Sequence, residues 1–353
     1  MFLKARARPL IGLDITTSSI KLIEISLKGS QYCVEAYAAE ATPANAMNEK
    51  AVTDPVLVAE AIQRAAKRAG TKTKDVAIAI SGDAAITKVI QMPDSLSAND
   101  LEDQIELQAD QFIPFPMDEV RYDYEVIGQS EKKVGMVDVL LVASRSENVA
   151  QRVLACEMAG LHVRVVDVEP YALENSCRLM MHQLPNGGVD RVIAVADFGA
   201  SSTTFSVMKN LSVIYTRDLA FGGNQLTEDI MRTYGLSYAD AGRSKKLGGL
   251  PDNYQSDVLN PFINDMCQQI IRSLQFFNAA GISREQPEFI LISGGCANIP
   301  GVAQYISNRL GIRAECCDPL GRVKVNSRAE SQRVRKDATA LLTACGLALR
   351  SVD

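Results

Sequence analysis

Two segments of this 353-residue chain each place an aspartate directly before a turn of small and hydroxylated residues. The first has Asp14 before residues 15–19 and then Lys21, and the second has Asp197 before residues 199–203. Small residues at a hairpin tip let backbone N–H groups converge on an anion, and serine or threonine hydroxyls add further donors. The carboxylate beside the turn suits magnesium, which prefers oxygen ligands and keeps several of its waters. One such hairpin is usually only a turn, but two at corresponding places in two halves predict a clamp for a polyphosphate.

A third segment runs from the apolar residues 289–293 into Gly294 and Gly295 and then into a helical pattern. Paired glycines allow a flat ligand or its phosphates to lie against the backbone. The alternative is a strand-to-helix turn in which one glycine needs a positive φ, and taken alone the segment favours this alternative. No G-x-G and no G-x-x-x-x-G-K-[ST] pattern occurs, which excludes the dinucleotide fingerprint, the kinase glycine loop and the P-loop. A nucleotide site in this chain would therefore be built by the two hairpins.

The composition is that of a soluble globular protein with roughly two or three structural units. Apolar residues make up 47% and charged residues 22%, and the formal charge of −5 leaves no basic field to hold nucleic acid. Only His162 and His182 occur, and the eight cysteines include no C-x-x-C pair, which argues against a histidine-rich metal centre and a zinc ribbon. No run of about 18 apolar residues occurs, and residues 1–9 lack the apolar core of a signal peptide. We therefore expect a cytosolic protein with reduced thiols.

The hydrophobic periodicity divides the chain into two similar halves with an insertion in the first. Residues 76–80 and 289–293 are continuous apolar runs typical of buried strands. Residues 81–162 differ in character and predict a small β-α-β-β-α unit with its own core. The other expected strands are 10–14, 20–27, 31–38, 163–168, 191–197, 203–208 and 213–217, and the other expected helices are 55–69, 222–247, 255–280, 300–310 and 337–350.

The order of these motifs resembles the actin/Hsp70/sugar-kinase superfamily. Residues 168–170 look like its first connecting segment, residues 338–347 like its second, and residues 221–227 like its G-G turn that opens a helix. A small unit inserted between the first strands and the first connector is the FtsA arrangement. Three further segments are similar to the PilM family of type IV pilus assembly proteins, namely 108–116, 167–173 and 248–251. The resemblance covers essentially the whole chain.

The resemblance implies an α/β, actin-like fold. Two halves, each with a ribonuclease H-like core, would form a duplicated ATPase-type fold with an FtsA-type inserted β-α-β-β-α subdomain. The implied parts are a first half at 1–80 and 163–190, joined by a C-terminal helix at 337–353; an inserted unit at 81–162; a second half at 191–221 and 288–336; and a helical subdomain on the nucleotide side at 222–287.

By the same resemblance, the ligand would be ATP with Mg²⁺, and Asp14 and Asp197 would face the metal through bound water. Glu169 occupies the place of a water-orienting acid in hydrolytic relatives, although it could equally cap the helix that follows it. Without the resemblance, Lys245 and Lys246 fit a solvated helix face. The residues implied to contact the nucleotide are Thr16, Thr17, Ser18, Ser19, Lys21, Gly199, Ala200, Ser201, Thr203, Gly222 and Gly223, with Lys245 near the ribose and Gly294, Gly295 and Asn298 beside the adenosine.

The function implied is that of a cytoplasmic ATP-binding scaffold in type IV pilus assembly and twitching motility, held at the inner membrane by a partner. Hydrolysis would be slow or absent, because Glu169 is the single plausible water-orienting residue. The alternatives are a slow ATPase of the same superfamily, a sugar kinase and an FtsA-like division protein. FtsA carries an amphipathic C-terminal helix after a linker, whereas this sequence ends at Asp353 directly after the last connector, which favours the pilus family. Membrane contact would be indirect, and self-association stays open.

The partner implied by the PilM family is the cytoplasmic N-terminal peptide of PilN, part of the inner-membrane platform of the pilus. Residues 112–116 form an unusually apolar exit from the helix of the inserted unit. Extended peptides bind apolar grooves through alternate side chains and main-chain hydrogen bonds. We therefore expect the peptide in a cleft between the unit at 81–162 and the first half. The alternative is that Phe112 and Phe115 only complete the core of the unit.

Overall fold

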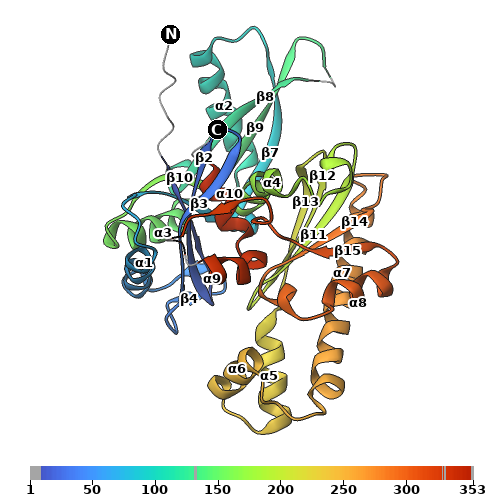
Figure 1. Cartoon of the computed structure of the whole chain (residues 1–353). Coiled ribbons are helices and arrows are strands. Elements are labelled where there is room, and N and C mark those ends of the chain that lie inside the picture. Colours follow the sequence, from blue (N-terminus) through green and yellow to red (C-terminus); the bar gives the residue numbers. More distant parts are fainter. Residues whose placement is uncertain (1–8, 131–132, 328, 330, 351–353) are drawn as a thin grey trace.

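The computed structural model describes residues 9–130, 133–327, 329 and 331–350 (Figure 1). The expectations for the start of the chain and for the last three residues of the C-terminal helix fall on residues outside this description. No helix within the described ranges is both long and apolar enough to cross a membrane.

Two sheets of the same topology form the two halves of the molecule. In each, three consecutive strands form an antiparallel meander, and its first strand pairs in parallel with a later strand that has another parallel strand beyond it. This repeated order confirms the duplicated fold. The first sheet contains, in spatial order, β10 (His162–Val168), β6 (Asp75–Ile80), β1 (Ile11–Ile15), β2 (Ser19–Lys28), β3 (Gln31–Ala41) and β16 (Lys324–Val325). The second contains β13 (Ser212–Leu219), β12 (Thr203–Lys209), β11 (Val192–Phe198), β14 (Phe289–Ser293) and β15 (Arg313–Cys316).

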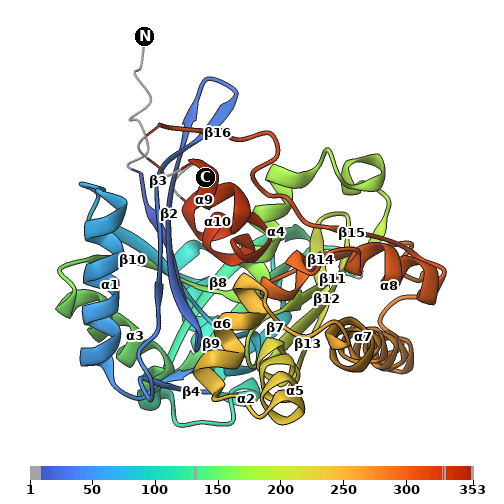
Figure 2. The same cartoon turned by 60° about the horizontal axis from the view of Figure 1, so that its bottom comes forward.

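The helices that cover these sheets are α1 (Pro55–Ala69), α3 (Ser146–Met158), α4 (Glu169–Met180), α7 (Asn260–Ala280), α8 (Val302–Leu310) and α10 (Leu342–Leu349). Helices pack against both faces of each sheet, and successive side chains of a strand point to opposite faces, so neighbouring residues join different cores. In β11, Ala194 packs in the core shared with α7 and α8, while Ile193 packs in the core shared with α4. Figure 2 shows the resulting layers, with α4 and α10 between the two sheets, α1 outside the first and α7 outside the second.

The two central helices approach each other and the first sheet so closely that only small residues fit. A Cβ on Gly346 of α10 would lie 1.7 Å from the carbonyl oxygen of Ala172 in α4. A Cβ on Gly12 of β1 would lie 2.0 Å from the carbonyl oxygen of Ala344 in α10. The small-residue composition of the predicted connector helix is therefore a packing requirement.

The inserted unit is a three-stranded sheet covered by one helix, and it stands at the top of the view in Figure 1. Its elements are β7 (Ala85–Pro93), α2 (Ala98–Phe112), β8 (Val120–Gln129) and β9 (Met136–Arg145), with the strand order β7-β9-β8. Ile105 and Ala109 of α2 share a core with Met92 and Leu141 of the sheet. The unit therefore has its own hydrophobic core, as the sequence predicted.

The helix α3 was expected in the inserted unit but packs in the first half instead. Its buried residues Ala155 and Cys156 share a core with Ile62 of α1 and Ile78 of β6. The unit therefore ends near Arg145, where β9 gives way to α3, rather than at residue 162. The helical periodicity showed that α3 exists, but it could not show which core its apolar face joins.

A second boundary also differs from the expectation, because residues 320–336 return to the first half. The short strand β16 pairs with β3, and Leu320 and Val323 share a core with Cys345 of α10. This segment then passes through α9 (Ser331–Lys336) and the 3₁₀ turn η6 (Ala338–Ala340) into α10. A strand of two residues carries no periodicity, so the sequence could not assign it to a sheet edge.

Two helices, α5 (Gly223–Tyr234) and α6 (Tyr238–Leu247), replace the single helix expected at 222–247. α5 ends at Gly235, whose φ of 65° is left-handed and reverses the chain. Ser237 then caps α6 by accepting a hydrogen bond from the backbone N–H of Asp240 at 3.1 Å. α5 and α6 lie at the bottom of Figure 1, at the opposite end of the molecule from the inserted unit.

We expect Gly346→Ala to lower the free energy of unfolding by about 1 to 3 kcal/mol or more, because the new methyl group would overlap the backbone of α4. Gly242→Ala in α6 is the matched control, since its Cβ would meet only Thr227 Cγ2 at an ordinary 3.8 Å. That change should raise stability by about 0.5 to 1 kcal/mol, because alanine loses less backbone entropy in a helix. Urea unfolding of both variants measures the difference, and equal stabilities would contradict the close crossing.

Candidate functional site

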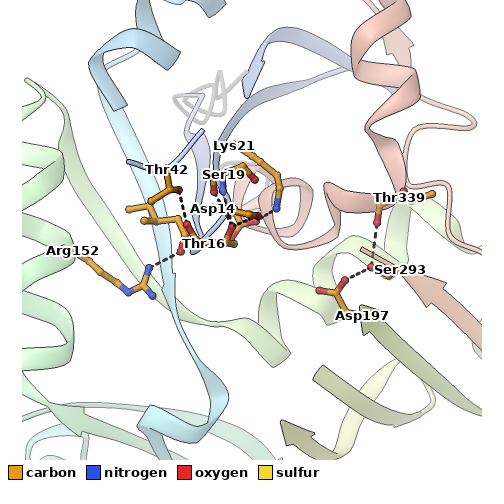
Figure 3. Close-up of polar contacts among 11 residues, drawn as sticks. Asp14, Thr16, Ser19, Lys21, Thr42, Arg152, Asp197, Ser293 and Thr339 are labelled. Atoms are coloured by element: carbon orange, nitrogen blue, oxygen red, sulfur yellow. Dashed lines mark hydrogen bonds and ion pairs between the residues drawn. The ribbon is translucent and has the colours of Figure 1, made fainter. Parts of the chain in front are cut away.

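A cavity of about 1380 Å³ lies between the two halves, and both aspartate hairpins contribute to its wall. Figure 3 shows the first hairpin and, across from it, the strand ends of the second half. Most of the residues that the sequence singled out line this cavity. They are Asp14, Thr16, Thr17, Ser18, Ser19, Lys21, Glu169, Asp197, Gly199, Ala200, Ser201, Gly223, Lys245, Gly294, Gly295 and Asn298.

Two of the expected contact residues, Thr203 and Gly222, do not line the cavity. Thr203 is 1% exposed, and its hydroxyl donates to the carbonyl oxygen of Phe221 at 2.7 Å. A Cβ on Gly222 would lie 2.5 Å from the carbonyl oxygen of Ala200, so the glycine packs against the back of the second hairpin. Both residues support the hairpin instead of facing a ligand.

The first hairpin is held by a buried ion pair and by hydroxyl groups in its turn. Asp14 and Lys21 stand opposite each other on β1 and β2, and Lys21 Nζ lies 2.8 Å from Asp14 Oδ2. Burial alone would lower the pKa of Lys21, but the charge and hydrogen bond of Asp14, together with the charges of Asp197 and Glu169, outweigh it and the pKa lies above its ordinary value. Thr16 Oγ1 donates to the carbonyl oxygen of Ser19 at 2.8 Å, and Thr42 donates to the carbonyl oxygen of Thr16 at 2.6 Å (Figure 3).

The second hairpin holds its aspartate differently. Asp197 stands opposite Thr204 on β12 and beside Ser293 at the end of β14. Ser293 Oγ donates to Asp197 Oδ1 at 2.9 Å. Burial raises the pKa of Asp197, although Lys21 across the cavity opposes the shift. Gly294 has a φ of 84°, and a Cβ there would lie 2.2 Å from the carbonyl oxygen of Phe198, so this position requires glycine.

The two hairpin tips meet across the cavity. Thr17 Oγ1 and Ser201 Oγ lie 3.0 Å apart, although 184 positions separate them in the sequence. Each tip ends a strand pair of a different sheet, so the contact joins the two halves directly. The geometry brings together the two motifs that the sequence placed in corresponding positions.

Lys50 is a site residue that sequence reasoning missed. It lies between the short strands β4 (Met47–Asn48) and β5 (Ala51–Val52) of the first half. Its Nζ lies 3.0 Å from Glu169 Oε2, 2.8 Å from Asp218 Oδ2 and 3.4 Å from Thr204 Oγ1. Asp218 and Thr204 belong to the second half, so one ammonium group bridges both halves. A single lysine in a turn has no motif around it that could have identified this role.

Lys50 and the carboxylates around it shift one another's pKa values. Burial raises the pKa of Glu169, and the nearby Lys50 opposes this shift without cancelling it. Burial would lower the pKa of Lys50, but Glu169 and Asp218 outweigh it and raise the pKa well above its ordinary value. Glu169 is therefore engaged in an ion pair, which a role as a simple helix cap does not require.

Arg152 is a second residue that the sequence did not single out. It lies on α3, is 5% exposed and also lines the cavity. Its Nη1 donates to the carbonyl oxygen of Ile15 at 3.2 Å, and its Nη2 donates to that of Lys50 at 2.6 Å. Arg152 thereby ties the start of the first hairpin turn to the segment that carries Lys50. Burial lowers the pKa of this guanidinium, with Glu169 opposing the shift.

Lys245 is not a solvated lysine, whereas its neighbour Lys246 is exposed. Lys245 Nζ donates to the carbonyl oxygen of Gly223 at 2.7 Å and to Thr227 Oγ1 at 2.6 Å. These bonds join α6 to the start of α5, and burial lowers the pKa of the ammonium group. Lys245 therefore fixes Gly223, the glycine of the G-G turn that lines the cavity.

The donor set fits a magnesium ion only if further ligands come with it. Asp14 and Asp197 supply the hard oxygen atoms that Mg²⁺ prefers. Within the described part of the chain, however, no group of three or more histidine, cysteine, aspartate or glutamate side chains could hold a metal. Mg²⁺ is commonly bound by one or two carboxylates together with the phosphates of a substrate. The arrangement therefore suits a metal that arrives on a polyphosphate.

Comparison with known proteins decides the family. A sequence model described as Type IV pilus assembly protein PilM matches residues 12–352. The chain belongs to this family. A solved PilM–PilN type IV pilus biogenesis complex contains a chain that is 30% identical and matches with a TM-score of 0.80, covering 98% of this chain and 99% of that one.

Two more distant proteins also match this chain. Cell division protein FtsA of Streptococcus pneumoniae serotype 2 (strain D39 / NCTC 7466) is 22% identical over an alignment 362 residues long. The alignment covers 87% of this chain and 75% of that protein. MreB5 of Spiroplasma citri, solved bound to ADP, is 12% identical with a TM-score of 0.50, covering 97% of this chain and 95% of that one. With the repeated sheet topology, these matches show the actin-like fold that the sequence predicted.

We expect Lys50→Met to lower the free energy of unfolding by about 1 to 3 kcal/mol, because it leaves two half-buried carboxylates without their cation. The loss should grow as the pH rises. A carboxyl group whose pKa is raised in the folded protein binds its proton more tightly there, so it costs stability once the pH passes its ordinary pKa. Removing Lys50 raises the pKa of Glu169 further and enlarges that cost.

Urea unfolding at about pH 5 and about pH 8 measures this difference, since the interval spans the raised carboxyl range. Lys72→Met is the control, because Lys72 is exposed and does not line the cavity. A deficit in Lys50→Met that is the same at both pH values, or larger at low pH, would contradict the ion-pair assignment.

Proposed function

We propose that this protein is a cytoplasmic ATP-binding scaffold of the inner-membrane platform of the type IV pilus, and that ATP joins its two halves as a structural ligand. The observation that carries the proposal is the contact of the two hairpin tips, Thr17 and Ser201, beside a cavity that Asp14 and Asp197 both line. Membership of the PilM family and the ADP bound to MreB5 support it.

The polyphosphate would lie between the hairpins, where the turns at 16–19 and 199–201 supply backbone N–H groups and hydroxyls. A magnesium ion on the phosphates would reach Asp14 and Asp197 through its own waters. The adenosine would lie against Gly295, where no heavy atom is found within 4 Å of a Cβ built on the residue. Bound in this way, one ligand would contact both sheets at once.

ATP would be held rather than turned over. A general base must reach the proton of the attacking water, and Glu169 is the one predicted candidate. Its Oε2 accepts a hydrogen bond from Lys50, which also binds Asp218 of the second half. The carboxylate is therefore fixed as part of the bridge between the halves, which favours a structural role over that of a mobile base.

Wild-type protein should bind ATP in the presence of Mg²⁺, and Asp14→Asn and Asp197→Asn should each weaken binding by about tenfold or more. That is the size expected when a charge-assisted contact is lost. Asparagine keeps the shape of the side chain, removes its charge and replaces one acceptor oxygen with an amide donor. Asp118→Asn is the control, because Asp118 is exposed on the inserted unit and does not line the cavity. Isothermal titration measures the affinities.

Wild-type affinity in both cavity variants would show that the clamp assignment is wrong. The same samples report on turnover, and steady-state phosphate release should stay below about 1 s⁻¹, the low end for ordinary enzymes. Faster release that Glu169→Gln abolishes would make the protein an ATPase and overturn the structural role of the nucleotide.

The partner would be the cytoplasmic N-terminal peptide of PilN, which would hold the protein at the inner membrane. The two phenylalanines of the inserted unit differ in their surroundings. Phe115 packs against the core of the unit beneath the guanidinium of Arg145, 4.4 Å from its ring centre. Phe112 is 37% exposed and lines a second cavity of about 370 Å³, together with Val89 of β7.

This second cavity has the features of a peptide groove. It lies beside β7, an edge strand of its sheet, and edge strands offer backbone N–H and C=O groups to an added strand. Phe112 and Val89 provide apolar contacts for alternate side chains of such a strand. The groove for the PilN peptide is therefore proposed at this edge of the inserted unit, instead of in the expected cleft between the unit and the first half, with Phe112 as the side chain that contacts it.

We expect Phe112→Ala to weaken binding of a PilN-derived peptide of about a dozen residues, by about tenfold if the ring is an anchor. Leu107→Ala on the same helix is the control, since Leu107 is 67% exposed and lies outside the cavity lining. Fluorescence anisotropy of the labelled peptide gives both affinities. Unchanged binding in Phe112→Ala and in Val89→Ala would put the partner site elsewhere. Deleting the whole expected unit is unsuitable, because it would remove α3 from the first core.

A further inference from the structure

The aspartates of the two duplicated hairpins have different neighbours. On the first, the residue opposite Asp14 is Lys21, which neutralises the carboxylate at 2.8 Å. On the second, the residue opposite Asp197 is Thr204, and no ion pair to Asp197 is found within the described residues. In its carboxylate form, Asp197 thus has no cation on its own hairpin to compensate it.

Ser293 holds the side chain of Asp197. It stands beside Asp197 in the parallel pair of β11 and β14, is 0% exposed, and donates its hydroxyl to Asp197 Oδ1 at 2.9 Å. A neutral hydroxyl fixes the direction of a carboxylate without cancelling its charge. The other side of the carboxylate is limited by Gly294, where a Cβ would lie 2.7 Å from Asp197 Oδ1.

Ser293 is itself fixed by the second connector. The carbonyl oxygen of Thr339 lies 3.2 Å from Ser293 Oγ and accepts the backbone N–H of Gly294 at 2.8 Å (Figure 3). Thr339 belongs to η6, which leads directly into α10. The helix that packs between the two sheets therefore sets the position of the serine that orients Asp197.

We propose that Ser293 is a positioning residue that orients Asp197 as the principal carboxylate for the nucleotide's divalent cation, while Asp14 serves mainly as the partner of Lys21. This inference rests on the proposed function as a nucleotide-binding protein. It adds that the two aspartates are not equivalent, and that the carboxylate that mainly holds the cation belongs to the second half. Outer groups that orient a metal-linked side chain commonly change metal affinity by about 10- to 100-fold when they are removed.

The test compares ATP binding with and without the metal and uses Mn²⁺ as a spectroscopic probe, because it takes the same oxygen ligands as Mg²⁺. Ser293→Ala should raise the metal concentration needed for half-maximal ATP binding by about tenfold, and Ser293→Thr, which keeps the hydroxyl, should restore it. Electron paramagnetic resonance of Mn²⁺ with ATP should show the same order of metal affinities, with Ser293→Ala weaker than the wild type and Ser293→Thr. Ser273→Ala is the matched control, because Ser273 is also 0% exposed and donates only within α7.

Variants of the aspartates themselves provide an independent test if a Ser293 variant fails to fold. Asp197→Asn should abolish the metal dependence of ATP binding, whereas Asp14→Asn should weaken binding and keep that dependence. Adding Ser293→Ala to Asp197→Asn should then change nothing further, since the serine acts through the aspartate. Equal loss of metal dependence in the two Asn variants would overturn the inference. So would a Ser293→Ala effect that is the same with and without metal. Absence of ATP binding in the wild type would instead refute the proposed function.

Discussion

The close crossing of α4 and α10 is the constraint on which the two halves depend. At Gly346 and Ala172 the two helices approach more closely than any side chain would allow, and at Gly12 the first sheet lies equally close to α10. Interiors are packed at the density of organic crystals, so such contacts leave little freedom for the sheets to shift. Both hairpins belong to these sheets, so a crossing that restrains the sheets also restrains the two tips, which meet at Thr17 and Ser201.

The site is built from buried charges that compensate one another unevenly. Lys21 neutralises one carboxylate, Lys50 is shared between two, and Arg152 is bound only to backbone carbonyl oxygens among the described residues. Burying a charge costs several kcal/mol unless a partner offsets it. The lysine shared across the halves therefore favours the arrangement in which both halves are together, and it links the protonation of Glu169 to that arrangement.

The sequence predicted the parts of the structure whose signals are local. The Asp14 and Asp197 hairpins and the Gly294 turn follow from residue types within a few positions, and the structure brings all three to one cavity. Lys50, Arg152 and Asp218 could not be predicted, because each comes from a segment without a motif and acts only through tertiary contacts. The boundaries predicted at 162 and 336, which the structure places near 145 and 320, differ for the same reason: periodicity shows that an element has an apolar face, but not which core that face joins.

A ligand between the hairpins would act on the relation of the two halves rather than on either half alone. The side chains that bridge them at the cavity include Thr17 with Ser201 and Lys50 with Asp218, all polar contacts that water can replace. A ligand present at 100 times its dissociation constant stabilises the state that binds it by about 2.7 kcal/mol. Folded domains are stable by only about 5 to 15 kcal/mol, so binding of this size would be enough to favour the arrangement that holds the ligand. Under the proposed function, occupancy of the site would thus control the scaffold without hydrolysis, which agrees with a glutamate fixed in the bridge between the halves.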